Sequence, residues 1–124
     1  MEKKYFVGES FSKAQRLESG EYEDCRFLQA ELESQDLTGY KFVDCHFEDS
    51  NMSLAKLKNT SFQKVHFKNC DLIGAIFDQS VLEKADFYSA EGYQINPAIN
   101  RIKKAKFSRE GVLGLVTHLD INIQ

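Results

Sequence analysis

The histidines are the first side chains in this sequence whose type and spacing could do chemistry. His46 and His66 lie twenty residues apart, and Arg26 and Asp86 continue the same spacing on either side. A metal site needs three or four ligands at a defined geometry, and an arginine is the wrong type of ligand. We therefore predict that the two histidines form a solvated surface ladder without a metal ion. His118 stands outside this series, near the end of an expected helix.

The cysteines come next, because a thiolate can act as a nucleophile. Cys25 and Cys45 are also twenty residues apart, whereas Cys70 has a different register. A reactive thiol needs exposure and a neighbouring base, and these positions offer neither, so we expect all three to pack as small hydrophobic residues. An odd number of cysteines and no apolar signal segment at the start of the chain favour reduced thiols and a cytoplasmic location.

Carboxylates also recur in one register, at Glu31, Asp71 and Glu91, with Asn51 between them. Paired carboxylates can serve as a general acid and a general base, but these are expected on a flat outer wall. The sequence has no glycine-rich phosphate loop, nucleophile elbow or zinc-ligand spacing. We therefore predict a protein that is not an enzyme and that needs no cofactor.

The elements that must position these side chains follow a repeat of five residues. Every fifth residue from Leu17 to Phe87 is large and apolar or aromatic, and eleven of the fifteen residues that stand two places earlier are Gly, Ala, Ser, Thr or Cys. Neither the helical period of 3.6 nor the strand period of two generates this pattern. The fifteen central residues are Leu17, Tyr22, Phe27, Leu32, Leu37, Phe42, Phe47, Met52, Leu57, Phe62, Phe67, Leu72, Phe77, Leu82 and Phe87.

A second period of twenty residues is nested inside the first. Similar segments recur at this spacing, such as 24–27, 44–47 and 64–67, and each ends in Phe. A square coil with one five-residue unit on each side explains both periods, and stacked coils then lie roughly 4.8 Å apart. The large central residue and the small residue both point inward. The predicted structural core contains Phe27, Phe47, Phe67, Phe87, Leu37, Leu57, Phe77, Met52, Leu72, Phe42 and Phe62.

This pattern resembles the pentapeptide-repeat family, whose units read Ala-(Asp/Asn)-(Leu/Phe)-X-X. The most similar units are Cys-Asp-Leu-Ile-Gly at 70–74, Ala-Ile-Phe-Asp-Gln at 75–79 and Ala-Asp-Phe-Tyr-Ser at 85–89. The resemblance covers residues 15–91 without a break and extends weakly to Phe107. It implies an all-β solenoid, a right-handed quadrilateral β-helix of about four to five coils. The family includes quinolone-resistance and toxin-immunity proteins that resemble duplex DNA and act on DNA gyrase.

The chain length fits a single domain, residues 1–124, whose regular coils are expected over 17–91. Residues 1–16 do not keep the period and are predicted to form an N-terminal capping strand or loop. Its aromatic side chains, which would close the open end, are Tyr5, Phe6 and Phe11. One residue inside the coils, Tyr40, breaks the rule of small side chains. It either fills the gap left by Gly20 one coil below or swings outward.

The C-terminal part, residues 92–124, is predicted to combine a loop, a last partial coil and a capping α-helix. The loop is expected over 90–100. Ser108 is a candidate N-cap for an α-helix over about 109–118, which carries an apolar stripe. The alternation of residues 119–123 favours a short strand.

Charge is distributed unevenly along the chain. The whole chain has 16 basic and 19 acidic residues, and its net charge of -3 is too weak to indicate a nucleic-acid or membrane partner. Residues 17–91 hold 15 acids and 7 bases, whereas residues 92–124 hold five bases and two acids. The C-terminal bases are expected to be solvated or to pair with the acidic coils. No segment approaches the ~18 apolar residues of a membrane span.

Outward apolar residues form the candidate interface. Those of the coils are expected near one corner, where either a terminal segment covers them or a partner binds. The candidate interface residues are Leu54, Ile73, Ile76, Leu115, Leu119, Ile121 and Ile123. We interpret the chain as a non-catalytic protein-protein interaction or scaffold module. Its partner would be another protein or a second copy bound through the C-terminal segment.

The alternative function is that of a DNA mimic that modulates or protects DNA gyrase or topoisomerase, like the quinolone-resistance proteins of the family. The acidic coils have the sign of charge that this function requires. Lysines interrupt the acidic walls, however, so no face is uniformly negative.

Overall fold

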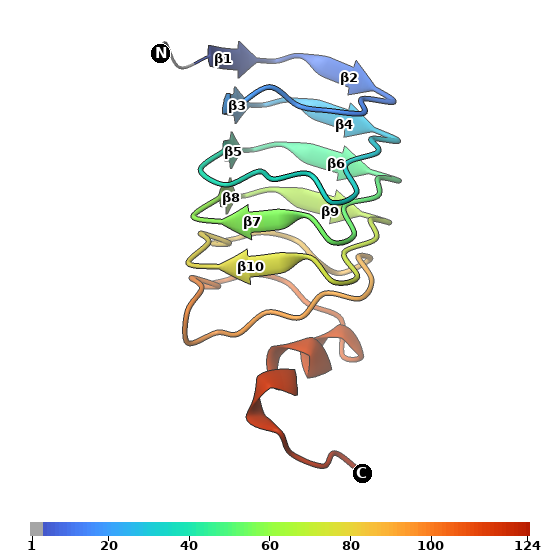
Figure 1. Ribbon diagram of the computed structural model, residues 1–124, viewed down its shortest axis with the longest axis vertical. Coiled ribbons are helices and arrows are strands. Elements are labelled where there is room, and N and C mark those ends of the chain that lie inside the picture. Colours follow the sequence, from blue (N-terminus) through green and yellow to red (C-terminus); the bar gives the residue numbers. More distant parts are fainter. Residues whose placement is uncertain (1–3) are drawn as a thin grey trace.

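The computed structural model describes residues 4–124 as a column of stacked coils followed by a short C-terminal segment (Figure 1). The strands are β1 (Lys4–Val7), β2 (Ser10–Ser12), β3 (Gly20–Glu23), β4 (Arg26–Leu28), β5 (Lys41–Val43), β6 (His46–Glu48), β7 (Lys56–Lys58), β8 (Ser61–Gln63), β9 (His66–Lys68) and β10 (Ile76–Asp78). They form three parallel sheets along the column, in the orders β1-β3-β5-β8, β2-β4-β6-β9 and β10-β7. The predicted right-handed β-helix is confirmed.

The register of the sheets reproduces the period of twenty. Phe42 pairs with Phe62 and Phe47 with Phe67, each one coil further along the chain. Isolated bridges at the same spacing continue to the pair Asp86 and Lys106. The coils therefore continue past residue 91 into the basic C-terminal part.

The core is a set of stacked rings and aliphatic side chains inside the column. Phe27 and Phe47 stack with ring centroids 4.4 Å apart, and Phe67 and Phe87 with centroids 4.9 Å apart. Rings of neighbouring walls meet edge to face, as Phe42 and Phe47 do at 5.2 Å. Since aromatic pairs favour both geometries, the interior is filled by contacts along each wall and between walls.

Polar residues in the small-residue positions are satisfied by the backbone of the preceding coil. Thr60 donates its hydroxyl hydrogen to the carbonyl of Leu37 at 2.8 Å, and the Cys70 thiol lies 3.3 Å from the carbonyl of Phe47. Because these hydrogen bonds offset the cost of burying polar groups, Ser, Thr and Cys substitute for Ala in this column.

The N-terminal segment forms a shortened first coil. Phe6 pairs with Tyr22 and Phe11 with Phe27, each at a spacing of sixteen residues. The rings stack at 4.6 Å and 5.1 Å and continue two of the aromatic ladders. The predicted capping role of Tyr5 is wrong, because its side chain is 66% exposed. It precedes an inward residue on a strand, so it points outward.

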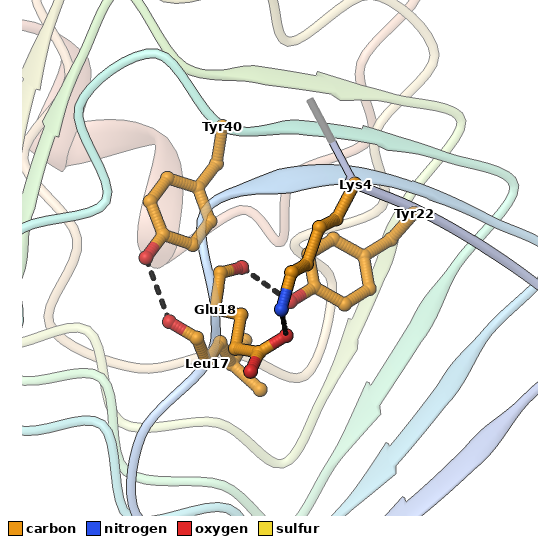
Figure 2. Close-up of polar contacts among 5 residues, drawn as sticks. All are labelled: Lys4, Leu17, Glu18, Tyr22 and Tyr40. Atoms are coloured by element: carbon orange, nitrogen blue, oxygen red, sulfur yellow. Dashed lines mark hydrogen bonds and ion pairs between the residues drawn. The ribbon is translucent and has the colours of Figure 1, made fainter. Parts of the chain in front are cut away.

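The hydroxyl groups of Tyr40 and Tyr22 form hydrogen bonds with the backbone near the N-terminal end of the column (Figure 2). The Tyr40 hydroxyl donates to the carbonyl of Leu17 at 2.7 Å, and the Tyr22 hydroxyl donates to the carbonyl of Glu18. An ion pair of 3.0 Å joins Lys4 to Glu18 on the outside. Tyr40 is buried, so the inward placement is correct.

Gly20 allows β1 to approach the next coil closely. A Cβ atom at Gly20 would lie 2.4 Å from the carbonyl oxygen of Lys4, so only glycine permits this contact. Gln35 binds the same turn: its amide nitrogen lies 3.0 Å from the Leu17 carbonyl, and its side-chain oxygen accepts from the Leu17 amide at 3.2 Å. Side chains thus replace the backbone partners that the shortened coil lacks.

The C-terminal segment differs from the prediction. In place of one α-helix over 109–118, it has two short 3₁₀ helices, η1 (Gly111–Leu115) and η2 (Thr117–Leu119). A Cβ atom at Gly111 would lie 1.8 Å from the Tyr93 hydroxyl oxygen, and one at Gly114 would lie 2.1 Å from the Tyr93 carbonyl oxygen. Two glycines in five residues weaken an α-helix, and here they permit close packing instead.

Ser108 still supports the start of the terminal segment, since its hydroxyl accepts a hydrogen bond from the Gly111 amide at 2.8 Å. The predicted strand over 119–123 is also wrong, because residues 120–124 have no regular structure. Among residues 4–124, no helix has the length and apolar character needed to cross a membrane.

Candidate interaction surface

The predicted core residues are all inside the column. Each of the eleven is at most 5% exposed, so none contributes to a surface site. The core extends further than the sequence pattern indicated. Tyr93 and Ile95, in the expected loop, are also buried. Tyr93 is out of phase with the repeat, whereas Ile95 is a large residue in the register of the small-residue positions, twenty residues after Ala75.

Three large apolar side chains stand exposed at one corner of the coils. Leu54, Ile73 and Ile76, which we call the apolar corner, are 53%, 57% and 53% exposed. Glycines on the following turns allow close stacking: a Cβ at Gly74 would lie 2.6 Å from Leu54 Cδ2, and one at Gly92 would lie 2.2 Å from Ile73 Cγ1. Of the two expectations, coverage by a terminal segment is wrong as far as residues 4–124 are concerned, since each of the three side chains is more than half exposed.

The C-terminal residues of the candidate interface separate into two groups. Leu115 is buried and joins the core, so it is not part of an exposed surface. Leu119, Ile121 and Ile123 are each more than half exposed. Two residues that the sequence interpretation did not select, Val112 and Leu113, are 43% and 48% exposed. We call the five exposed residues the C-terminal apolar segment.

A groove lies between the apolar corner and the C-terminal part of the chain. Its volume is about 520 Å³, and its lining includes Ile76 of the apolar corner, Ile95 of the last coil, and Thr117 and His118 of the C-terminal segment. Apolar side chains exposed in a cluster of this kind mark interaction sites more often than isolated ones do. This region is therefore the candidate interaction surface.

The histidine ladder lies elsewhere, on the sheet β2-β4-β6-β9. The rings of His46 and His66 stack in parallel, with centroids 4.4 Å apart and planes 2° apart. His66 Nδ1 lies 3.6 Å from a carboxylate oxygen of Asp86, and Arg26 pairs with Glu48 at 3.0 Å. In parallel stacked rings the nitrogen lone pairs lie in separate planes, so they do not converge on one ion. Within residues 4–124, no three ligand-type side chains are grouped to hold a metal.

The surroundings of His46 lower its pKa. Burial is the largest cause, followed by the repulsion of a proton by His66 and by Arg26, while Glu48 acts in the opposite direction. The environment of His46 therefore affects its protonation, whereas the sequence spacing alone indicated only a solvated ladder.

The cysteines lie in the interior and none forms a disulfide. Burial raises the pKa of both Cys45 and Cys70 to about 12. Since the thiolate is the nucleophilic form, these thiols are unreactive at neutral pH in the folded state. Their environment fits the packing role that the sequence suggested.

The outward carboxylates form the expected column, and at least one stabilises its own turn. Bridges connect Glu31 to Asn51, Asn51 to Asp71 and Asp71 to Glu91. Asp71 accepts a hydrogen bond from the Ile73 amide at 2.9 Å, and Asn51 accepts one from the Ser53 amide at the same distance. Such Asx turns are a structural use of these side chains.

Comparison with known proteins identifies the class to which these coils belong. A family model described as "Pentapeptide repeat region" matches residues 21–96, more than half of the chain. The chain therefore belongs to the pentapeptide repeat family. Proteins of this family are generally structural or interaction modules.

Several solved pentapeptide repeat structures are similar to the chain. Rfr23 from the cyanobacterium Cyanothece 51142 is 13% identical, with 85% of this chain and 84% of that chain covered and a TM-score of 0.39. QnrB1, a plasmid-mediated fluoroquinolone resistance protein, is 11% identical, with 95% and 100% covered and a TM-score of 0.39. HetL, which is involved in heterocyst differentiation regulation in Nostoc, is 14% identical, with 82% and 59% covered and a TM-score of 0.26. Among curated proteins, none matches the chain in sequence.

Proposed function

We propose that this protein is a non-catalytic interaction module that binds a protein partner through the apolar corner and the C-terminal apolar segment. The observation that carries the proposal is the exposure of these large apolar residues, together with a groove that is lined by Ile76 of the corner and by Thr117 and His118 of the C-terminal part. Burial of each such side chain at an interface contributes about 1.5–3 kcal/mol before ordering costs are subtracted. The rigid coils would hold the corner in a fixed arrangement.

The remaining candidate residues support a non-catalytic role. The thiols of Cys45 and Cys70 are protonated at neutral pH, and Asp71 accepts a hydrogen bond from its own turn. The two stacked histidines have a carboxylate on one side and an arginine on the other. No nucleophile and base are paired in these groups.

A second copy of the chain is one partner that this surface fits, with the C-terminal apolar segments in contact. Light scattering coupled to size-exclusion chromatography tests this form of the proposal. We expect a dimer that Ile121→Lys converts to a monomer. Tyr88→Lys is the matched control, because Tyr88 is 68% exposed on a different wall and its replacement should leave the dimer intact. A dimer that survives Ile121→Lys contradicts this contact.

A different protein partner is tested by comparing capture from the native host by the unaltered chain and by Leu54→Asn/Ile76→Thr. Asn suits the positive φ of 59° at Leu54, and Thr keeps the strand preference at Ile76, so this variant should fold. We expect loss of the bound partner. Equal capture by both chains would remove the apolar corner from the proposal.

The alternative, a DNA mimic, is supported by the acidic first coils but not by the rest of the column. The net charge is negative over the first two full coils and alternates in sign over the following ones. Residues 16–55 hold ten acids and three bases, 56–75 one acid and four bases, 76–95 four acids and one base, and 96–115 one acid and five bases. A supercoiling assay with DNA gyrase, with and without a quinolone, tests this function. An absence of effect at large molar excess would rule it out.

A further inference from the structure

The stacked histidines form a contact between two coils that depends on their state of protonation. His46 comes from β6 and His66 from β9, directly opposite each other in the parallel register. Their centroids are 4.4 Å apart and their planes differ by 2°. Two neutral imidazoles stack favourably in this geometry, whereas two imidazolium ions at this distance repel each other.

We propose that His46 and His66 form a pH-sensitive clasp between neighbouring coils, in which a proton on one ring opposes a proton on the other. In this clasp the two rings stay stacked when at least one of them is neutral. Acidification charges both rings, unstacks them and weakens the contact of β6 with β9. This device goes beyond the proposed interaction function and does not depend on it.

The charged groups beside His46 differ from those beside His66. Arg26 of β4 lies opposite His46 in the ladder, and its own partner is Glu48 at 3.0 Å. On the other side, Asp86 follows His66 in register, with a carboxylate oxygen 3.6 Å from Nδ1. The remaining charged residues near the pair are Asp24, at the corner before β4, and Lys68, in the same hollow, while Lys106 lies beyond Asp86 in the ladder.

This arrangement fixes which ring resists the second proton. A charged His66 would have a carboxylate beside it, whereas a charged His46 would lie between Arg26 and a charged neighbour. The lowered pKa of His46 agrees with this geometry, with burial as the largest cause and His66 and Arg26 next. Because the unfolded chain binds a proton at His46 more readily than the folded chain does, stability rises with pH through this range. The contribution is complete above the ordinary histidine pKa of about 6.5 and is lost as the pH falls toward the lower, folded value.

Histidine side-chain NMR titration of the full chain tests the coupling between the rings. In His66→Gln, the titration midpoint of His46 should move upward, toward the ordinary value, because the neighbouring charge is absent. In Arg26→Gln it should also move upward, although Glu48 then loses its partner. His118→Gln is the matched control, since it removes a histidine outside the coils. An unchanged His46 midpoint in His66→Gln would overturn the proposal.

Urea denaturation at pH 7.5 and pH 5.0 tests the effect on stability. The unaltered chain should lose more stability on acidification than His46→Gln, which has no proton to accept at this position. The carboxylates are the same in both proteins, so the difference isolates His46. An equal loss in the two proteins would show that the stack does not couple protonation to stability, and it would also contradict the clasp.

Discussion

Replacing Phe47 by alanine removes a ring from the middle of the longest aromatic ladder. Phe47 is fully buried, stacks on Phe27 at 4.4 Å and on Phe67 at 5.7 Å, and meets Phe42 edge to face at 5.2 Å. Loss of a buried Phe side chain costs about 3–5 kcal/mol, depending on how far the cavity collapses. Here the neighbouring rings are held by backbone ladders on both sides, so they cannot move far into the gap. We expect a loss near the upper end of that range.

Such a loss is large compared with the total stability of a domain, which is about 5–15 kcal/mol. Urea denaturation followed by circular dichroism measures it. Because each coil contacts only its neighbours, the transition should also broaden as the coils on the two sides of the cavity uncouple. Tyr88→Ala is the control, since this residue is 68% exposed and a surface change costs within about 0.5 kcal/mol. A loss below about 1 kcal/mol for Phe47→Ala would refute the view that stacked rings stabilise the column.

Two further substitutions and one labelling experiment probe the ends and the interior. Tyr40→Phe removes the hydroxyl bound to Leu17 and should cost about 0.5–1.5 kcal/mol in urea denaturation; no change would show that this hydrogen bond has no net value. Gly114→Ala places a Cβ about 2.1 Å from the Tyr93 carbonyl, so the C-terminal segment should separate from the coils and be cut faster in limited proteolysis, while the coils stay resistant. Native Cys45, with its pKa raised to about 12, should not react with a thiol reagent at pH 8 until urea is added. Rapid labelling of the folded chain would contradict its burial.

The interior of the coils was predictable because its packing is nearly one-dimensional. Within the regular coils, residues that are twenty positions apart in the sequence lie on the same wall of neighbouring coils. A contact between coils can therefore be predicted from the residue numbers alone. Phe27, Phe47, Phe67 and Phe87 could be placed on one wall without knowledge of any other contact. The same spacing predicted that His46 and His66 are neighbours on one wall. The register of the strands also places Arg26 next to His46.

The ends were not predictable in this way, because they depart from the repeat. Phe6 and Phe11 are five residues apart, like consecutive central residues, but Leu17 follows Phe11 by six residues where two sides of a regular coil take ten. The first coil is therefore four residues short, and its pairing at a spacing of sixteen is visible only in the structure. At the other end, the apolar stripe favoured an α-helix, whereas contact with Tyr93 decided in favour of short 3₁₀ turns.

The amino-acid sequence by itself determined the square column, its core and the columns of outward side chains, because a strict period leaves only one way to bury a large residue every five positions. The tertiary structure alone decided three further features. It gave the corners a positive φ, which Leu54 and Lys64 adopt as well as Asp24. It left the apolar corner open, and it brought the histidine rings to stacking distance. Each of these depends on backbone and side-chain torsion angles and on the packing around them, which the spacing of residues along the chain does not specify.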